Sequence, residues 1–312
     1  MTTGLLDYFD EKIAVVAAEQ ELLHDAIRTQ LGLPRGRKGA CRRPDPFLFL
    51  GSDRSMMRHA CQVVARQIVV PRCIPMEFRP FFGQAKGLRS ASCDGLARLE
   101  AALEMARVAG ALAWIRQVVR VVILFRGGTL NSFYNPRAHG AVFIRLNRHC
   151  DDLHVFEELV HQAGHAFFAI LLCREPPLIR NQRSFLTGVF DKGDNERNML
   201  VAFHGLVTEA VISGTLFRLA ASRGPVRSTV LGRLAFCLAK FGSDLNAAMR
   251  ARRLLTKQGM LWLSAMARSY ESMVRARGRE LLRVDLTDQP YVFDPQLCRR
   301  RNSWLAMETP CQ

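Results

Sequence analysis

Residues 157 to 172 read EELVHQAGHAFFAILL, and this stretch decides how the rest of the chain is interpreted. Its apolar residues recur at helical spacing, which predicts a helix from about Leu153 to Cys173 that begins after Asp151 and Asp152. An apolar stripe on one side would face a core; it comprises Leu153, Phe156, Val160, Ala163, Phe167 and Ile170. The helix is therefore expected in the protein interior, with its polar residues on the other stripe.

Two β-branched segments precede this helix, VVRVVILF at 118 to 125 and AVFIRLN at 141 to 147, and both are predicted to be strands. Strand, strand and metal-binding helix is the order of zincin-like cores, which is an analogy of fold alone. Helical patterns cover 5–31, 54–69, 93–114, 197–223 and, with breaks near Gly242 and Gly259, the chain to about Arg277; a loop is expected at 32–46 and an extended tail from 278. The predicted fold class is mainly α with a small β element (α+β).

The 312 residues are enough for one large domain or two small ones. We expect three regions that form one compact unit. These are an N-terminal helical region at 1–117, a metal-binding catalytic core at 118–225, and C-terminal helices with a basic tail at 226–312.

The composition, with 49% hydrophobic and 23% charged residues, is that of a globular protein. Nine scattered cysteines with no CxxC pair argue against a disulfide framework and against a cysteine zinc cluster. The N-terminus is acidic and lacks the pattern of a signal peptide, and the apolar runs are shorter than the roughly 20 residues of a membrane span. We therefore expect a cytoplasmic protein with no membrane partner.

The net charge of +16 calls for an explanation in terms of partners. Basic residues gather at 34–44, 250–253 and 298–302, without a zinc finger, an RNP motif or a basic-region heptad. Solvated basic faces are the simplest interpretation, an anionic substrate comes next, and nucleic acid is an unlikely partner.

His161 and His165 are candidate metal ligands, because residues four apart lie on one face of a helix. Glu158, one turn before His161, could accept the second ring proton of that histidine and so fix its tautomer. An HxxxH spacing alone is weak evidence, but buried imidazoles are costly unless they are satisfied.

His204, on the next predicted helix, is the preferred third ligand, and Gly205 beside it would permit close packing. Arg197 lies seven residues earlier on nearly the same face and could pair with a carboxylate of an anionic cosubstrate. The rival ligands are Glu209, Asp191 and Asp194, whereas His154 is more simply a polar residue at a helix start.

Gln162 stands where the HExxH signature of metallohydrolases has its glutamate. That glutamate removes a proton from the metal-bound water, a step worth about 10²–10⁴-fold in rate, and an amide cannot do this. Chemistry of iron(II), 2-oxoglutarate and dioxygen does not need such a base, and it requires two or three protein ligands with open positions on the metal.

HQAGH, preceded by FEELV and followed by a helix bearing RNMLVAFHG, resembles the HExxH-type iron(II)- and 2-oxoglutarate-dependent peptide β-hydroxylases that modify ribosomally made peptides. The resemblance covers about residues 118 to 225 and implies His161, His165 and His204 as iron ligands and Arg197 as the clamp for 2-oxoglutarate. It also implies a supporting role for Glu158 and Gln162, and a peptide or carrier-bound substrate. The basic surface could attract an acidic leader segment, and the strand at 141–147 could pair with an extended peptide. Gln162 departs from the glutamate usual in the family.

Two alternatives remain open. One is a zincin-type zinc metallohydrolase that uses another base, namely Glu157, Glu158 or Glu209. The other is a non-catalytic basic interaction protein in which the histidine spacing is incidental.

Overall fold

The structure, a computed structural model, describes residues 61–64, 68–83, 85–128, 130–135, 138, 140–147, 150–174, 178–180, 199–222, 227–290 and 293–307. These residues are mostly helical and include a small mixed sheet, so the predicted α+β, mainly α class is confirmed. They divide into two compact units, one ending at Arg174 and one beginning at Leu178. The division falls inside the predicted core region of 118–225. The helix expected at 5–31 and the loop at 32–46 lie outside the described residues.

The first unit, which we call the sheet unit, contains a six-stranded sheet in the order β1-β2-β4-β6-β5, with β3 pairing with β4. Its elements are β1 (Cys61–Val64), β2 (Ile68–Pro71), the 3-10 helix η1 (Met76–Phe82), β3 (Arg89–Ser90), α4 (Ser92–Val108), α5 (Leu112–Val118), β4 (Val121–Arg126), β5 (Phe133–Tyr134), β6 (Ala141–Arg145) and α6 (Asp152–Arg174). β4 lies parallel to β2 and β6. Its residues Val121 to Phe125 are all buried, as expected of a central strand covered on both faces.

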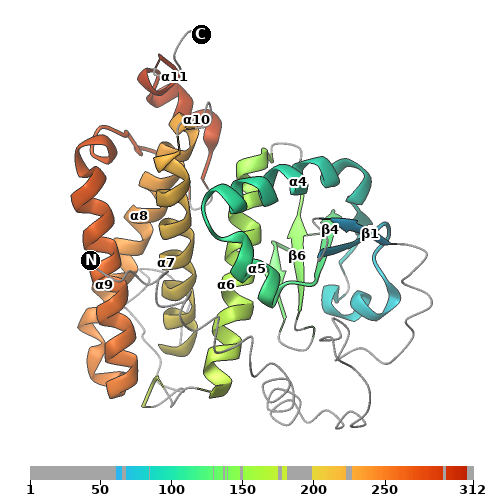
Figure 1. Ribbon diagram of the computed structural model, residues 1–312, viewed down its shortest axis with the longest axis horizontal. Helices are drawn as coiled ribbons and strands as arrows, with labels where there is room; N and C mark the ends of the chain where they lie inside the picture. The colour runs from blue at the N-terminus through green and yellow to red at the C-terminus, as the bar shows by residue number, and fades with distance from the viewer. Residues whose placement is uncertain are drawn as a thin grey trace. The chain divides into compact units, whose positions relative to one another are not determined.

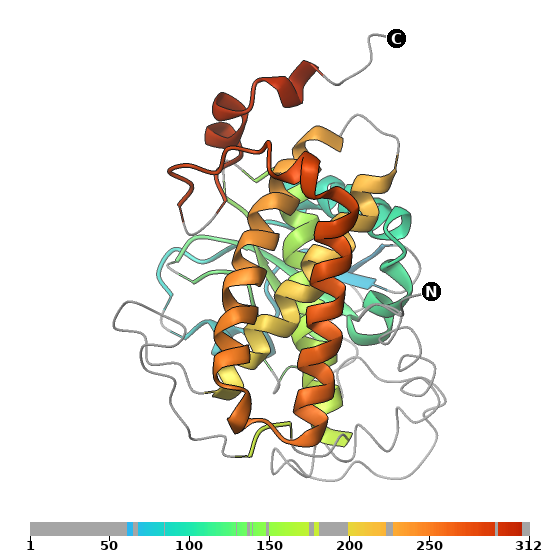
Figure 2. The same cartoon turned by 90° about the vertical axis from the view of Figure 1, so that its left-hand side faces the viewer.

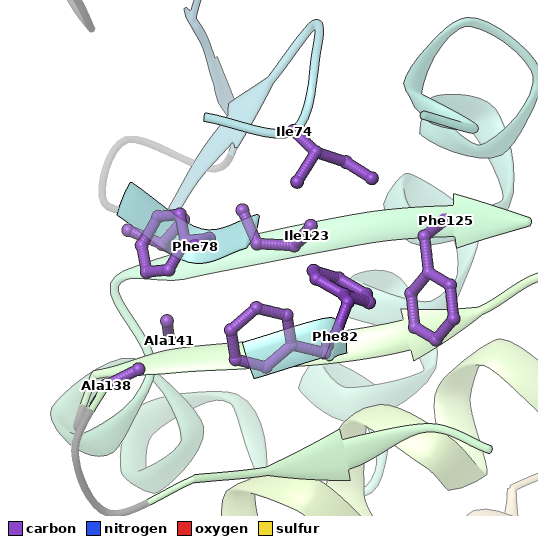
Figure 3. Close-up of a cluster of buried hydrophobic side chains, with 9 residues drawn as sticks. Ile74, Phe78, Phe82, Ile123, Phe125, Ala138 and Ala141 are labelled. Carbon is purple, nitrogen blue, oxygen red and sulfur yellow. The ribbon is translucent and has the colours of Figure 1, made fainter. Parts of the chain in front are cut away.

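One face of the sheet carries a cluster of aromatic side chains (Figure 3). Phe78 and Phe82 of η1 pack on alternate residues of β4 and β6, including Phe125 and Phe143. The Phe82 ring centroid lies 5.0 Å from that of Phe125 and 5.4 Å from that of Phe143, both edge-on. Such aromatic pairs add about 0.5–1.5 kcal/mol beyond their buried area. The short η1 segment thus completes a core that the strands alone would leave open.

Helices α4 and α6 pack against each other in the same unit (Figure 1). Gly95 of α4 lies so near β4 that a Cβ placed there would come within 2.8 Å of Leu124 Cδ1 and 2.4 Å of Leu146 Cδ1. A side chain at this position would have to displace the ends of both leucines, so the glycine suits the contact between α4 and the strand, and α6 reaches β5 and β6 beside it.

The second unit, which we call the helical unit, has no named strand among its described residues. It contains α7 (Met199–Ala221), α8 (Arg227–Arg250), the 3-10 helix η3 (Arg252–Leu254), α9 (Lys257–Leu281), α10 (Pro295–Arg301) and α11 (Trp304–Met307). α7, α8 and α9 pack on one another, and Figure 2 shows α8 and α9 side by side. Among the described helices, α7 alone is long and apolar enough to cross a membrane, and 67% of its apolar window is buried within the protein.

Several predicted elements need correction. Residues Cys61–Val64 and Ile68–Pro71 are strands rather than the end of a helix over 54–69. The helix expected at 93–114 is two helices, separated at Gly110, whose φ is +69°. α8 runs without a break through Gly242, so the break expected there is wrong, whereas the break expected near Gly259 lies just before it, around η3, and α9 begins at Lys257. The tail predicted to be extended contains α10 and α11.

Candidate metal site

The helix that carries the histidine pair starts at a capped N-terminus. Asp151 Oδ1 accepts a hydrogen bond from the backbone N–H of His154 at 2.7 Å, which satisfies one of the free N–H groups of the first turn. α6 then runs from Asp152 to Arg174, within one residue of the predicted bounds at each end. His154 thus lies in the first turn, as expected of a polar residue at a helix start.

Most of α6 is buried, and its incompletely buried residues lie chiefly on one stripe. That stripe contains His154, Glu158, His161, His165 and Ala169, which recur at three- and four-residue intervals. The predicted apolar stripe is buried where the structure describes it, with Phe156, Val160 and Ala163 at 0% exposure. The packing of α6 therefore leaves both histidines on its accessible side.

His161 and His165 turn the same nitrogen toward each other. Their Nε2 atoms are 3.0 Å apart, and their ring centroids are 4.7 Å apart with planes tilted by 35°. With metal–nitrogen distances of about 2.0–2.1 Å, two nitrogens at right angles on one ion are about 2.9 Å apart and two at a tetrahedral angle about 3.4 Å. Both nitrogens are therefore close enough to reach one metal ion. Without metal, the same distance allows one ring to donate a hydrogen bond to the other.

Gln162 is 2% exposed, although it adjoins the accessible stripe. Its Nε2 donates to Glu158 Oε2 at 3.3 Å, and this carboxylate partner fixes which end of the amide is nitrogen. Its Oε1 is buried and has no hydrogen-bond partner among the described residues. Glu158 thus binds Gln162, rather than the ring of His161 as its spacing predicted.

The described residues contain no group of three His, Cys, Asp or Glu side chains that could hold a metal ion. His204 and Glu209, both half-buried, lie on α7 in the helical unit, whereas His161 and His165 belong to the sheet unit. Arg197, Asp191 and Asp194 are outside the described residues. The role of His204 as third ligand and that of Arg197 as cosubstrate clamp therefore stay predictions.

Gly205 was expected to allow another element to approach His204. A Cβ placed at Gly205 would meet no described atom within 4 Å, so close packing does not explain this glycine. The expectation is wrong as far as the described residues go.

β6, which the sequence suggested as a partner for an extended peptide, is an interior strand. It pairs with β4 along Ala141 to Arg145 and with β5 through Val142 and Phe143. A peptide would have to displace β5 or add at another edge. The apolar run at 141–144 indicates that the strand is buried, but it does not show which strands lie on either side of it.

The burial of Gln162 and its bond to Glu158 are the features that sequence reasoning did not anticipate. The four-residue spacing of the two residues was visible, but not which of them would be covered. The sequence matches no protein-family model and no curated protein.

Proposed function

We propose that this chain is an iron(II)- and 2-oxoglutarate-dependent oxygenase that hydroxylates a β-carbon of a residue in a peptide or carrier-bound substrate. The observation that carries the proposal is the 3.0 Å separation of His161 Nε2 and His165 Nε2 on the accessible stripe of α6. This separation is short enough for both nitrogens to bind one metal ion. The resemblance of HQAGH and its neighbours to peptide β-hydroxylases supports the reaction class.

Bound iron(II) would supply the oxidation: one atom of dioxygen enters the substrate C–H bond, and the other enters succinate as 2-oxoglutarate loses carbon dioxide. His161 and His165 would hold the ion and leave positions open for the cosubstrate. In this proposal His204 is the third ligand and Arg197 pairs with the far carboxylate of 2-oxoglutarate. The expected partner is a peptide with an acidic leader segment.

Gln162 supports an oxygenase over a hydrolase. Its amide is buried and donates to Glu158, and it has no group that can accept a proton from a metal-bound water at neutral pH. Its contribution would be to hold the Glu158 carboxylate beside the histidine pair.

Zinc-dependent hydrolysis is a second candidate because of one contact. Glu158 Oε2 lies 3.3 Å from Gln162 Nε2, so a carboxylate capable of accepting a proton is present on the stripe of the two histidines. In that case Glu158 would replace the missing glutamate of the HExxH signature.

Anaerobic loading with iron(II) tests the proposal. Wild-type protein should bind about one equivalent of iron and show a higher melting temperature with metal, because a ligand that binds only the folded state stabilises it. On exposure to air with 2-oxoglutarate it should form succinate. His161→Ala should lose all three effects.

His154→Ala is the matched control, since it removes an imidazole from the same stripe one turn before Glu158. It should bind iron and turn over 2-oxoglutarate as the wild type does. Retention of iron by His161→Ala would exclude the histidine pair as the metal site. Zinc binding with casein cleavage that Glu158→Gln abolishes would instead establish the hydrolase.

A further inference from the structure

Helix α9 in the helical unit has one exposed face with an unusual composition. Six residues define what we call the α9 cationic face: Lys257, Leu261, Arg268, Arg275, Arg279 and Leu282. At 3.6 residues per turn they lie within about 40° of the direction of Arg268. The four cations are exposed, and the side chains of Leu261 and Leu282 are 64% and 88% exposed.

The opposite side of α9 fixes this orientation. Gly259, Trp262, Leu263, Met266 and Met273 are buried, and all of them point away from the α9 cationic face. Rotation of α9 about its axis would bring arginines into the core, so the face is held outward by the packing of the helical unit.

The four cations form no ion pair with any described residue. Arg277, on the opposite side of the same helix, pairs with Glu280 at 2.8 Å, whereas no described carboxylate lies within ion-pair distance of Arg268, Arg275 or Arg279. Glu271, an exposed carboxylate of α9, lies three residues after Arg268 and four before Arg275, but it forms no ion pair with either. Arg275 and Arg279 are four residues apart, a spacing at which like charges destabilise a helix by about 0.2–0.5 kcal/mol. Without a bound partner, these like charges lower the stability of α9.

The α9 cationic face is long, and its residues recur at a regular spacing along the helix. Leu261 and Leu282 are 21 residues apart, which is about 32 Å along a helix, and the three arginines occupy about 17 Å between them. Leu261, Arg268, Arg275 and Leu282 recur every seven residues, the spacing at which one helix meets another along a seam. Arg252 and Arg253 of η3, also exposed, extend the positive charge just before α9.

We propose that the α9 cationic face binds an acidic amphipathic helix of another polypeptide. In this complex, carboxylates spaced three and four residues apart pair with Arg268, Arg275 and Arg279. Apolar residues at the two ends of the partner helix cover Leu261 and Leu282. The proposal concerns binding alone and does not depend on the metal site.

The chemistry of the face favours a polypeptide over other anions. A nucleic-acid backbone would neutralise the arginines but would leave two leucines exposed at the ends. A membrane-bound helix needs a continuous apolar face, and here three arginines separate the leucines. A partner helix can match the central charges and both apolar ends at the same time.

The probe for the test is a fluorescein-labelled helical peptide with two leucines 21 residues apart and glutamates at three- and four-residue spacing between them. A scrambled peptide of the same composition is its control. The full-length protein should bind the ordered peptide more tightly than the scrambled one. Arg268→Glu/Arg275→Glu/Arg279→Glu should weaken this binding at least about tenfold, since each exposed pair contributes modestly and the three act together. Leu261→Ala/Leu282→Ala should remove the preference for the ordered peptide.

Arg72→Glu/Arg79→Glu/Lys86→Glu is the charge-matched control, because these three cations are exposed and belong to the sheet unit. It should leave peptide affinity within about twofold of the wild type. Equal weakening by the two triple variants would reduce the effect to net charge and overturn the proposal. Tighter binding of a 20-nucleotide single strand, or of vesicles containing phosphatidylserine, would overturn the choice of partner.

Discussion

At the scale of single residues, Gln162 is the position that bears most directly on chemistry. A glutamate at this position could accept a proton from a metal-bound water, as the corresponding glutamate does in metallohydrolases. The amide of Gln162 instead donates a hydrogen bond to Glu158. The neutral side chain can be buried at 2% exposure next to a carboxylate without placing two negative charges together. The substitution therefore suits the local packing as well as the proposed reaction.

Gln162→Glu should lower the melting temperature of the metal-free protein at neutral pH. It places a second carboxylate about 3.3 Å from Glu158 in a buried position, and we expect a loss of roughly 1–3 kcal/mol in the free energy of unfolding. Added metal should recover part of this loss, because a nearby cation favours ionised carboxylates. Thermal unfolding with and without iron(II) measures both effects.

Gln162→Leu separates the charge from the loss of the amide. It removes the buried oxygen that lacks a described partner and adds no charge, so its melting temperature should stay closer to that of the wild type. A larger loss for Gln162→Leu than for Gln162→Glu would show that the amide bond to Glu158, and not charge, dominates at this position.

At the scale of elements, some glycines in helices are explained by contacts with distant parts of the chain, which their low helix propensity does not reveal. Gly242 and Gly259 suggest helix breaks, yet Gly242 lies in the middle of α8 and Gly259 in the first turn of α9, and both are at contacts with other parts of the helical unit. A Cβ at Gly242 would be 2.5 Å from Tyr270 Oη, and one at Gly259 would be 2.0 Å from the carbonyl oxygen of Leu178. These glycines are needed for close approach rather than for a turn.

Gly259→Ala should destabilise the protein although alanine is the better helix former. The new methyl group would collide with backbone, which cannot move away as a side-chain end can, and we expect a loss of about 1–3 kcal/mol. Chemical denaturation measures the change. Gly278→Ala in the same helix is the control, since its Cβ would meet only Val274 Cγ1 at 3.8 Å, and it should be neutral or stabilising by up to about 1 kcal/mol. Equal effects of the two changes would contradict the packing explanation.

The segment from Cys61 to Pro71 shows why elements cannot always be read locally. CQVVARQIVVP has apolar residues compatible with a helix, and its valines and isoleucine are equally compatible with strands. In the folded chain, β1 pairs with β2 and Val69 pairs with Val121 of β4. The partner strand is 52 residues away, so no local pattern contains the information that decides this element.

At the scale of the whole molecule, the two compact units have separate cores. The sheet unit is centred on the aromatic cluster, and the helical unit on buried residues of α7, α8 and α9. Regions of one protein can open at different free energies, so separate cores allow the two units to open separately.

Phe82→Ala should therefore weaken the two units unequally. Phe82 is 3% exposed and touches Phe125, Phe133 and Phe143, and we expect its truncation to cost about 3–5 kcal/mol. Hydrogen exchange followed by mass spectrometry should show faster exchange in β4 and β6 with little change in α8 and α9. Phe241→Ala, which removes a 0% exposed ring packed on Tyr270, should show the reverse pattern. Uniform acceleration in both variants would mean that the chain unfolds as one cooperative unit.

Local sequence patterns were sufficient to predict the mainly helical α+β class, strands β4 and β6, and α6 with both histidines on one stripe. These features depend on side chains within a few residues of one another, and helical or strand periodicity encodes such contacts directly. Three features became visible in the folded chain alone: β2 joins the sheet, Gly242 and Gly259 are packing positions, and Gln162 is buried against Glu158 while the histidines stay accessible. These features depend on which distant segments of the chain pack against each residue. The spacing of side chains along the sequence does not specify those contacts.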